Sequence, residues 1–394
     1  MIRTWANLRD DPIQPIMVER TKNDPSPLMG EIRPDIFYKV DIVVIGGGQA
    51  GLSAAYHLKK EGVPPGRGFV VLDDEFGPGG AWQHRWDSLT LSNVNGINDL
   101  PGMAFAQAVD TADTELQANL AVPTYYGHYE KTFELPIIRP IRVWEVTRGK
   151  GRFTIRTNGV QFSARGIINA TGTWKTPHCP RYPGWEGFKG RQLHTGDYRS
   201  AEDFRDKHVI IVGGGISAVQ MLGEVSQVAR TTWVTRTPPD FRDYAFNPEH
   251  GREAVAMVDQ RVREGLPPRS VVSVTGLPIT PAIAALLKKG VMEPRPMFDE
   301  ITATGVRWAD GSVLGADVIF WNTGFRHSLD HLAPLGLKNA SGGIEMSGKL
   351  ATQVTRDPRI HLTGYGPSSS TIGANRAGRA AARELIATLG VRTP

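Results

Sequence analysis

The stretch Asp41-Ile42-Val43-Val44-Ile45-Gly46-Gly47-Gly48-Gln49-Ala50-Gly51 decides the fold. A short apolar run ends in Gly-x-Gly-x-x-Gly, and the following residues have helical spacing. This pattern predicts the strand, tight turn and helix of a dinucleotide-binding unit. Gly46 permits the turn, Gly48 lets the backbone approach a pyrophosphate, and Gly51 lets the helix pack close to the strand.

A second apolar strand supports this prediction. Phe69-Val70-Val71-Leu72-Asp73 ends in an acid 22 residues after Gly51, where a ribose hydroxyl would need an acceptor. We therefore expect Asp73 to contact the nucleotide. The free amides of Gln49 and Ala50, at the start of the helix, would face its phosphates.

The same pattern occurs again about 167 residues later, at His208-Val209-Ile210-Ile211-Val212-Gly213-Gly214-Gly215-Ile216-Ser217-Ala218. The next strand, 231–236, ends in Arg236 instead of an acid. An arginine fork at this position suits a 2′-phosphate, so the second site is expected to prefer NADPH, although a surface arginine is the alternative. The residues expected to hold this second nucleotide are Gly213, Gly215, Ser217, Ala218 and Arg236.

Other glycine-rich segments are expected to contact the cofactors. Two apolar strands end in the similar segments Ala170-Thr171-Gly172 and Asn322-Thr323-Gly324, which suggests that both nucleotide domains close in the same way. Gly79-Gly80-Ala81-Trp82-Gln83 is either a ligand-contacting loop or an ordinary turn beside a core tryptophan. The candidates from these segments and from the end of the chain are Gly80, Trp82, Gln83, Thr171, Gly172, Thr323, Gly324, Gly364 and Thr371.

The fold class expected from these elements is α/β, with two Rossmann-like dinucleotide-binding domains. A strand at 360–366 and a helix from Thr371 to about Leu389 would return to complete the first domain. We expect further a strand at 136–143, a helix at 115–132, and hairpins at 152–169 and 306–314. The expected boundaries are an irregular arm or disordered segment at 1–38, an FAD-binding domain at 39–178 and 326–394, and an NADPH-binding domain at 179–325. Residues 238–299 would form an insertion able to lie over the cleft between the domains.

Composition limits the class of protein. The 394 residues are 40% hydrophobic and 22% charged, with a net charge of +5 and scattered Lys and Arg, which argues against a nucleic-acid partner. No window approaches a membrane span and the first 38 residues lack a secretion signal, so a cytoplasmic protein is expected. A homodimer is one option for its oligomeric state, which the sequence leaves open. Cys179 is the single cysteine, which excludes an internal disulfide, a CxxC pair and a cysteine-based metal cluster, and no metal site is predicted.

Two dinucleotide sites imply electron transfer between two cofactors. FAD at the first site and NADPH at the second is the economical assignment. Because a dithiol route is closed, the reduced flavin must pass its electrons to oxygen, a quinone or another protein.

One segment narrows these choices. Phe188-Lys189-Gly190-Arg191-Gln192-Leu193-His194-Thr195-Gly196-Asp197-Tyr198 resembles the FxGxxxHxxxY signature of the flavin-containing monooxygenases, the class B flavoprotein monooxygenases. The glycine-rich and Thr-Gly segments described above also occur in the family's order, so the resemblance covers about residues 40–390. It is greatest to the small bacterial members, which oxidise sulfides, amines and some ketones.

The resemblance implies a reaction cycle. NADPH reduces FAD, oxygen adds at the flavin C4a atom, and the (hydro)peroxyflavin transfers one oxygen atom to a small-molecule substrate while NADP⁺ stays bound. Family members place an asparagine near C4a, for which Asn93 is the candidate, with Ser92 and Asn95 as alternatives. His194 is the second catalytic candidate, or else a hinge or core residue. The Baeyer–Villiger form of the signature ends in Trp-Pro, whereas this chain has Tyr198-Arg199, which argues against strict ketone specificity.

Three hypotheses follow for the function. The main one is an NADPH- and O2-dependent monooxygenase that acts on a soft nucleophile such as a sulfide or amine. The alternative enzyme is a flavin reductase or NADPH oxidase that passes electrons to oxygen, a quinone or a protein. The third is a nucleotide-binding sensor without turnover.

Overall fold

The computed structural model describes residues 37–94, 96–242, 248–268 and 276–391. All of these residues belong to the compact unit 33–394. Nearly all of the arm expected at 1–38 therefore lies outside the described residues. Within the described part of the chain, no helix is both long and apolar enough to cross a membrane.

A nine-stranded sheet carries the first glycine-rich turn. Its main path runs β17-β18-β19-β6-β1-β2-β3, and the antiparallel pair β4–β5 extends from β6. Strands β19, β6, β1, β2 and β3 are parallel to their neighbours, so their carboxyl ends meet at one edge. The strands are β1 Phe37–Ile45, β2 Phe69–Leu72, β3 Ile137–Ile138, β4 Val143–Arg148, β5 Phe153–Thr157, β6 Gln161–Asn169, β17 Met346–Ser347, β18 Gln353–Val354 and β19 Ile360–Leu362.

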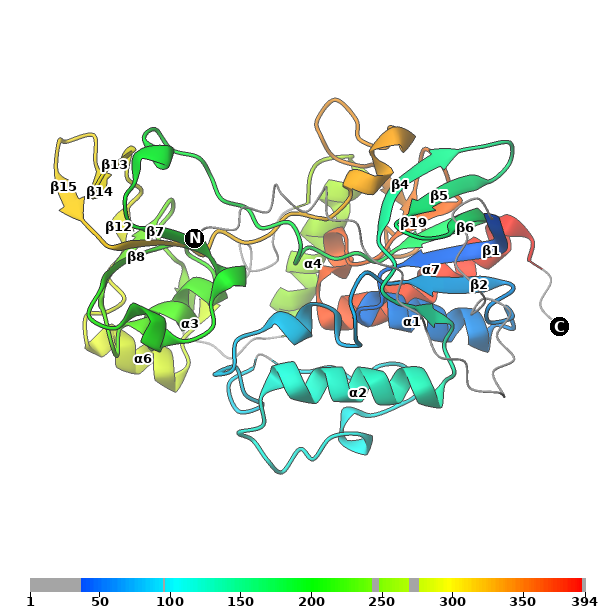
Figure 1. Ribbon diagram of the computed structural model, residues 1–394, viewed down its shortest axis with the longest axis horizontal. Helices are drawn as coiled ribbons and strands as arrows, with labels where there is room; N and C mark the ends of the chain where they lie inside the picture. Colours follow the sequence, from blue (N-terminus) through cyan, green and yellow to red (C-terminus); the bar gives the residue numbers. More distant parts are fainter. Residues whose placement is uncertain (1–36, 95, 243–247, 269–275, 392–394) are drawn as a thin grey trace. The chain divides into compact units, whose positions relative to one another are not determined.

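Helices α1 Gln49–Lys60 and α7 Thr371–Leu389 pack together on this sheet (Figure 1). Their small residues fill the core with the apolar side chains of β1, β2 and β6. α2 Ala118–Thr132 buries three tyrosines. The predicted helices over 115–132 and 371–389 and the hairpin at 152–169 are confirmed.

The strand predicted over 136–143 is wrong in extent. Only Ile137–Ile138 pairs with β2, and the next strand begins at Val143. Pro140 lacks a backbone donor for a sheet ladder, and the Arg139 side chain forms ion pairs with Asp73 and Glu130.

A second, five-stranded parallel sheet carries the second turn, in the order β12-β9-β8-β16-β7. Helix α3 Ile216–Val225 follows β8, and α6 Pro281–Lys288 contacts α3. A three-stranded antiparallel sheet, β13-β14-β15, contains the predicted hairpin near 306–314. The remaining strands are β7 Arg191–His194, β8 His208–Val212, β9 Arg230–Thr235, β10 Phe241–Arg242, β11 Leu277–Pro278, β12 Arg295–Pro296, β13 Glu300–Thr302, β14 Gly305–Arg307, β15 Val313–Gly315 and β16 Val318–Trp321.

The segment 238–299 is divided between the two sheets. Helix α4 Pro248–Arg263 contacts β17 and the short helix η8 Gly366–Ser369, which belong to the first sheet's side. Arg263 Nη2 also donates to the Gly348 carbonyl. In contrast, α6 contacts α3 beside the second sheet. The other short helices are η2 Gly80–His84, η3 Phe105–Gln107, η4 Trp185–Gly187, η5 Thr195–Asp197, η6 Ala201–Phe204 and η7 Asp330–Leu335.

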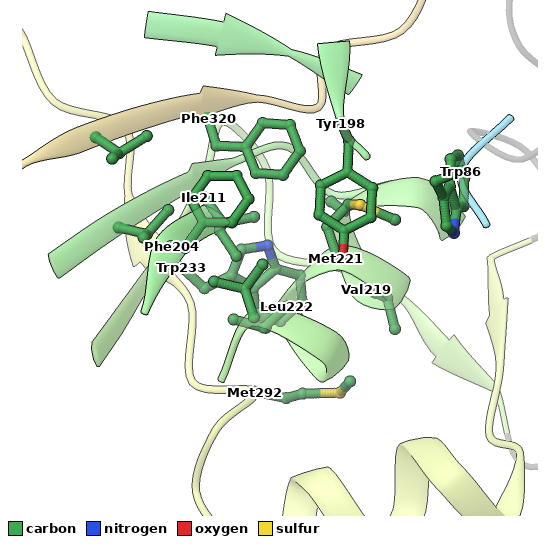
Figure 2. Close-up of a cluster of buried hydrophobic side chains, with 14 of the residues drawn as sticks. Trp86, Tyr198, Phe204, Ile211, Val219, Met221, Leu222, Trp233, Met292 and Phe320 are labelled. Atoms are coloured by element: carbon green, nitrogen blue, oxygen red, sulfur yellow. The ribbon is translucent and has the colours of Figure 1, made fainter. Parts of the chain in front are cut away.

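An aromatic cluster forms one core of the second sheet. Tyr198, Phe204 and Phe320 stack with centroid separations of 5.4–6.0 Å, and Trp86 packs edge-on against Tyr198 (Figure 2). Trp86 belongs to the loop after η2, so this loop is anchored in the second sheet's core. A buried aromatic side chain of this kind contributes roughly 1.5–3 kcal/mol.

Candidate functional site

The first glycine-rich turn has no space for side chains at Gly46 and Gly51. Gly46 has φ +104°, and a Cβ added to it would lie 2.5 Å from the Ala170 carbonyl oxygen. A Cβ on Gly51 would lie 1.9 Å from the Gly46 oxygen. Gly48 precedes α1 and provides no side-chain cap, so the first amides of α1, including those of Gln49 and Ala50, remain available for an anion.

The loop with two glycines touches this turn directly. A Cβ on Gly80 would lie 2.9 Å from the Gly48 Cα, and Trp82 and Gln83 follow Gly80 within η2. Strand β6 pairs with β1 and is followed by Thr171 and Gly172, and β19 pairs with the other side of β6 and is followed by Thr363 and Gly364. The candidates on these strand ends and on the loop therefore gather at the carboxyl edge of the sheet.

Asp73 lies at the same edge but already has a cationic partner. Its Oδ2 atom accepts from Arg139 Nε at 2.6 Å, and Arg139 also forms two hydrogen bonds with Glu130, at 2.6 and 2.8 Å. Burial lowers the pKa of Arg139, but the two acids outweigh this effect and raise it. A Cβ on Gly47 would meet this cluster at 2.7–2.8 Å. Arg139 and Glu130 belong to no sequence motif, so the sequence alone does not indicate their role.

Thr371 begins α7 and is tied to the start of α1. Gln49 Nε2 donates to the Thr371 carbonyl at 3.3 Å and to the Asn98 carbonyl at 3.4 Å. Asn98 Nδ2 donates to Thr371 Oγ1, and Asn375 Nδ2 donates to the Asp99 carbonyl at 2.6 Å. These bonds hold the N-termini of the two helices together, through contacts across about 320 residues that the sequence could not indicate.

The second turn repeats the construction of the first. Gly213 has φ +137°, and its added Cβ would lie 2.2 Å from the Asn322 carbonyl oxygen. Gly215 precedes α3 without a side-chain cap, so the amide of Ser217 lies in an uncapped first turn. Ala218 is fully buried, as the third small position requires.

The carboxyl edge of the second sheet is cationic. Arg236 directly follows β9 and is exposed, and it has no acidic partner within the described residues. Arg326 Nε donates to His178 Nδ1 at 3.2 Å. Burial lowers the pKa of His178, and the charges of Arg326 and Arg236 lower it further. Arg326 and His178 were missed because they belong to no recognised motif.

His194 is the last residue of β7, and its ring contacts the segment Thr323-Gly324 through a hydrogen bond. Its Nε2–H donates to the Gly324 carbonyl at 2.9 Å, and its Nδ1 accepts from the Gly196 amide at 3.2 Å. Thr323 Oγ1 donates to the His178 carbonyl. Burial lowers the pKa of His194, which favours the neutral ring that this bonding pattern needs.

Comparisons with known proteins agree on one family. The pyridine nucleotide-disulphide oxidoreductase family matches residues 43–263. A solved flavin-containing monooxygenase from Stenotrophomonas maltophilia is 35% identical, with a TM-score of 0.74, and the alignment covers 89% of this chain and 99% of that one. The chain belongs to this family, among its flavin-containing monooxygenases.

Two curated relatives are more distant. An uncharacterized oxidoreductase of Bacillus velezensis is 27% identical, and the alignment covers 77% of this chain and 86% of the relative. An indole-3-pyruvate monooxygenase of rice, Oryza sativa, is 24% identical, with coverages of 73% and 76%.

The residues of this flavin-containing monooxygenase fit FAD and NADPH, the cofactors that the family uses. Gly46 and Gly213 leave no space for a side chain, and the helices that follow both present uncapped amides. The cations Arg236 and Arg326 lie at the carboxyl edge of the second sheet, where the 2′-phosphate of NADPH would need them.

The remaining candidate lies on the surface of this monooxygenase. Asn93 is exposed, its Oδ1 accepts from the Thr90 amide at 2.9 Å, and its Nδ2 donates to the Ser88 carbonyl at 2.8 Å. Ser92 is also exposed, and Asn95 lies outside the described residues. The choice among these three stays a prediction.

Proposed function

We propose that this chain is an NADPH- and O2-dependent monooxygenase that transfers one oxygen atom to a soft nucleophile, a thioether or an amine, with ketones as secondary substrates. The observation that carries the proposal is the pair of equivalent turns with different edges. The first has the acid Asp73, and the second has the cations Arg236 and Arg326. This difference suits one resident flavin and one phosphorylated nicotinamide coenzyme.

FAD held at the first turn would supply the redox chemistry, namely hydride acceptance from NADPH and activation of oxygen. The chain's own residues bind and orient. The amides that begin α1 and α3 bind the two pyrophosphates, while His194 fixes the Gly324 backbone through its Nε2–H. His194 then acts as a positioning residue, and the neutral state of its ring is needed for both of its hydrogen bonds.

A single cysteine cannot form a dithiol, so a dithiol–disulfide pair within the chain is not the electron acceptor. Burial, together with the negative charge of Asp197, raises the pKa of Cys179 to about 11, so its thiolate is scarce at neutral pH. With one cysteine, the chain cannot form the internal disulphide that a disulphide oxidoreductase of this family would reduce. Oxygen is the acceptor that best suits its likeness to the Stenotrophomonas enzyme.

Asn93 is proposed as the side chain that assists oxygen activation near the flavin. Replacement of an assisting group should release more of the activated oxygen as hydrogen peroxide. We therefore expect Asn93→Ala to raise peroxide per NADPH consumed, with FAD binding unchanged, and Thr111→Ala, at an exposed residue without an assigned role, to serve as the control. Equal peroxide yields from both variants and the native chain would refute this role.

The experiment for the function uses the FAD-loaded protein with NADPH, oxygen and methyl phenyl sulfide. One sulfoxide per NADPH consumed is expected. An oxidase would instead release peroxide in proportion to NADPH even with the sulfide present. FAD that NADPH cannot bleach without oxygen would mean a protein without this turnover.

A further inference from the structure

Arg85 is a cation that contacts two aromatic rings beside the loop 79–83, which is called the flavin loop below. Its backbone amide closes η2 by donating to the Trp82 carbonyl at 3.1 Å. The guanidinium carbon lies 4.4 Å from the centroid of the Trp174 ring and 5.7 Å from that of Trp82. These contacts hold the plane of the guanidinium in one orientation.

This guanidinium has no partner of opposite charge among the described residues. Its Nε atom is buried and makes no hydrogen bond. Burial lowers the pKa of Arg85 to about 10, and no carboxylate contributes to that shift. The side chain is therefore still charged at neutral pH. The buried Arg139, in comparison, makes three hydrogen bonds to two acids, as buried charges normally do.

Two neighbouring polar groups are also unsatisfied. Trp86 Nε1 and Asn119 Oδ1 are buried without a hydrogen bond, as is Arg85 Nε. Asn119 is tied to the same segment, because its Nδ2 donates to the Arg85 carbonyl at 3.1 Å. An unsatisfied buried polar atom is costly and rare in folded proteins, so the unpaired Nε of a cation, in a segment with two further unsatisfied atoms, points to a ligand.

The position of Arg85 connects the two halves of the site. Trp174 stacks on Phe325 at 4.8 Å, and Phe325 follows Gly324, the residue that His194 holds. On its other side, Trp82 belongs to η2, whose Gly80 touches the first glycine-rich turn. A group bound at Arg85 would therefore lie between the flavin loop and the Gly324 turn.

We propose that Arg85 binds an oxyanion, and that a carboxylate on the organic substrate supplies it. Arginine in a fixed plane matches the two oxygens of a carboxylate. The other sources of oxyanions are the two cofactors. The FAD pyrophosphate has the uncapped amides of α1, and the phosphates of NADPH have those of α3 and the cations Arg236 and Arg326. The inference rests on the proposed function for the identity of the substrate and makes it a carboxylate-bearing thioether or amine.

The test measures binding, so it does not depend on oxygen transfer. The oxidised, FAD-loaded protein is titrated with 4-(methylthio)benzoate, with the neutral 4-(methylthio)benzamide and with NADP⁺, and the flavin absorbance change gives each Kd. In Arg85→Gln, the benzoate should bind about tenfold or more weakly, and the other two Kd values should change less than twofold. Arg85→Lys should recover part of the loss.

Arg205→Gln is the matched control, since Arg205 forms an exposed pair with Glu202 and should leave all three Kd values unchanged. A loss confined to NADP⁺ would keep the oxyanion and assign it to the coenzyme. Unchanged Kd values for both anions in a folded, FAD-loaded Arg85→Gln would overturn the inference. Normal benzoate binding without any sulfoxide product would contradict the proposed function instead.

Discussion

Arg236→Gln should reduce the preference for NADPH over NADH. Arg236 directly follows β9, at the carboxyl edge where a coenzyme ribose is expected, and its charge acts on His178. Glutamine preserves most of the side-chain length but removes the charge and the fork. Because NADH lacks the 2′-phosphate, the loss should fall on NADPH alone.

The magnitude follows from the exposure of the site. A hydrogen bond to a charged group contributes about 1.5–3 kcal/mol, and the exposed position of Arg236 favours the lower end of that range. About 1.5 kcal/mol corresponds to roughly a tenfold change in affinity. Arg326, the second cation at this edge, should keep the loss from becoming larger.

The assay is the steady-state KM for NADPH and NADH in the FAD-loaded protein. Arg230→Gln is the control, because Arg230 begins the same strand and lies about 20 Å from Arg236 at roughly 3.3 Å per residue. We expect about a tenfold rise in the KM for NADPH in Arg236→Gln and no change in the control. An equal rise for NADH, or the same effect from Arg230→Gln, would refute the phosphate assignment.

Three further predictions test the packing. Gly213→Ala would bring a Cβ to 2.2 Å from the Asn322 oxygen at φ +137°, so it should abolish NADP⁺ binding or lower Tm by several degrees. Gly187→Ala has open space and should do neither. Tyr198→Phe removes the 2.6 Å bond to Glu224 Oε2 and should cost about 1–2 kcal/mol in urea unfolding; an unchanged midpoint contradicts that contact. Acid should also destabilise the fold, because burial strongly lowers the pKa of four histidines, and the unfolded chain therefore takes up protons first as the pH falls below 6.5. The loss from pH 7 to 5 should be on the order of 7 kcal/mol, and a flat pH profile would refute it. The four are His57 (about 4), His327 (about 4), His331 (about 4) and His361 (about 3).

Glycine patterns allowed the two turns to be predicted from sequence. The structure gives Gly46 and Gly213 the same environment, each against the carbonyl at the end of a neighbouring strand. Local sterics require glycine there, so the signal is local. Helix α7 was likewise predictable to the residue, because Ser370 caps it and Gly390 ends it in the left-handed region.

Contacts between distant segments could not be predicted in this way. The ion pairs of Arg139 with Asp73 and Glu130, and of Lys175 with Asp74 and Glu75, have no sequence spacing that would indicate them. Arg85 is a clear case, since one arginine among 45 basic residues gives no signal. Its importance arises from the two rings that it contacts and from the lack of an acidic partner in the part of the chain that the structure describes.

The central claim is that electrons from NADPH pass through FAD to oxygen and that one oxygen atom reaches the substrate. The most direct measurement reduces the FAD-loaded protein with one equivalent of NADPH without oxygen, then adds ¹⁸O2 and methyl phenyl sulfide. The account predicts about one ¹⁸O-labelled sulfoxide per FAD and little peroxide. Unreacted sulfide, with hydrogen peroxide formed in proportion to the NADPH consumed, would contradict this claim.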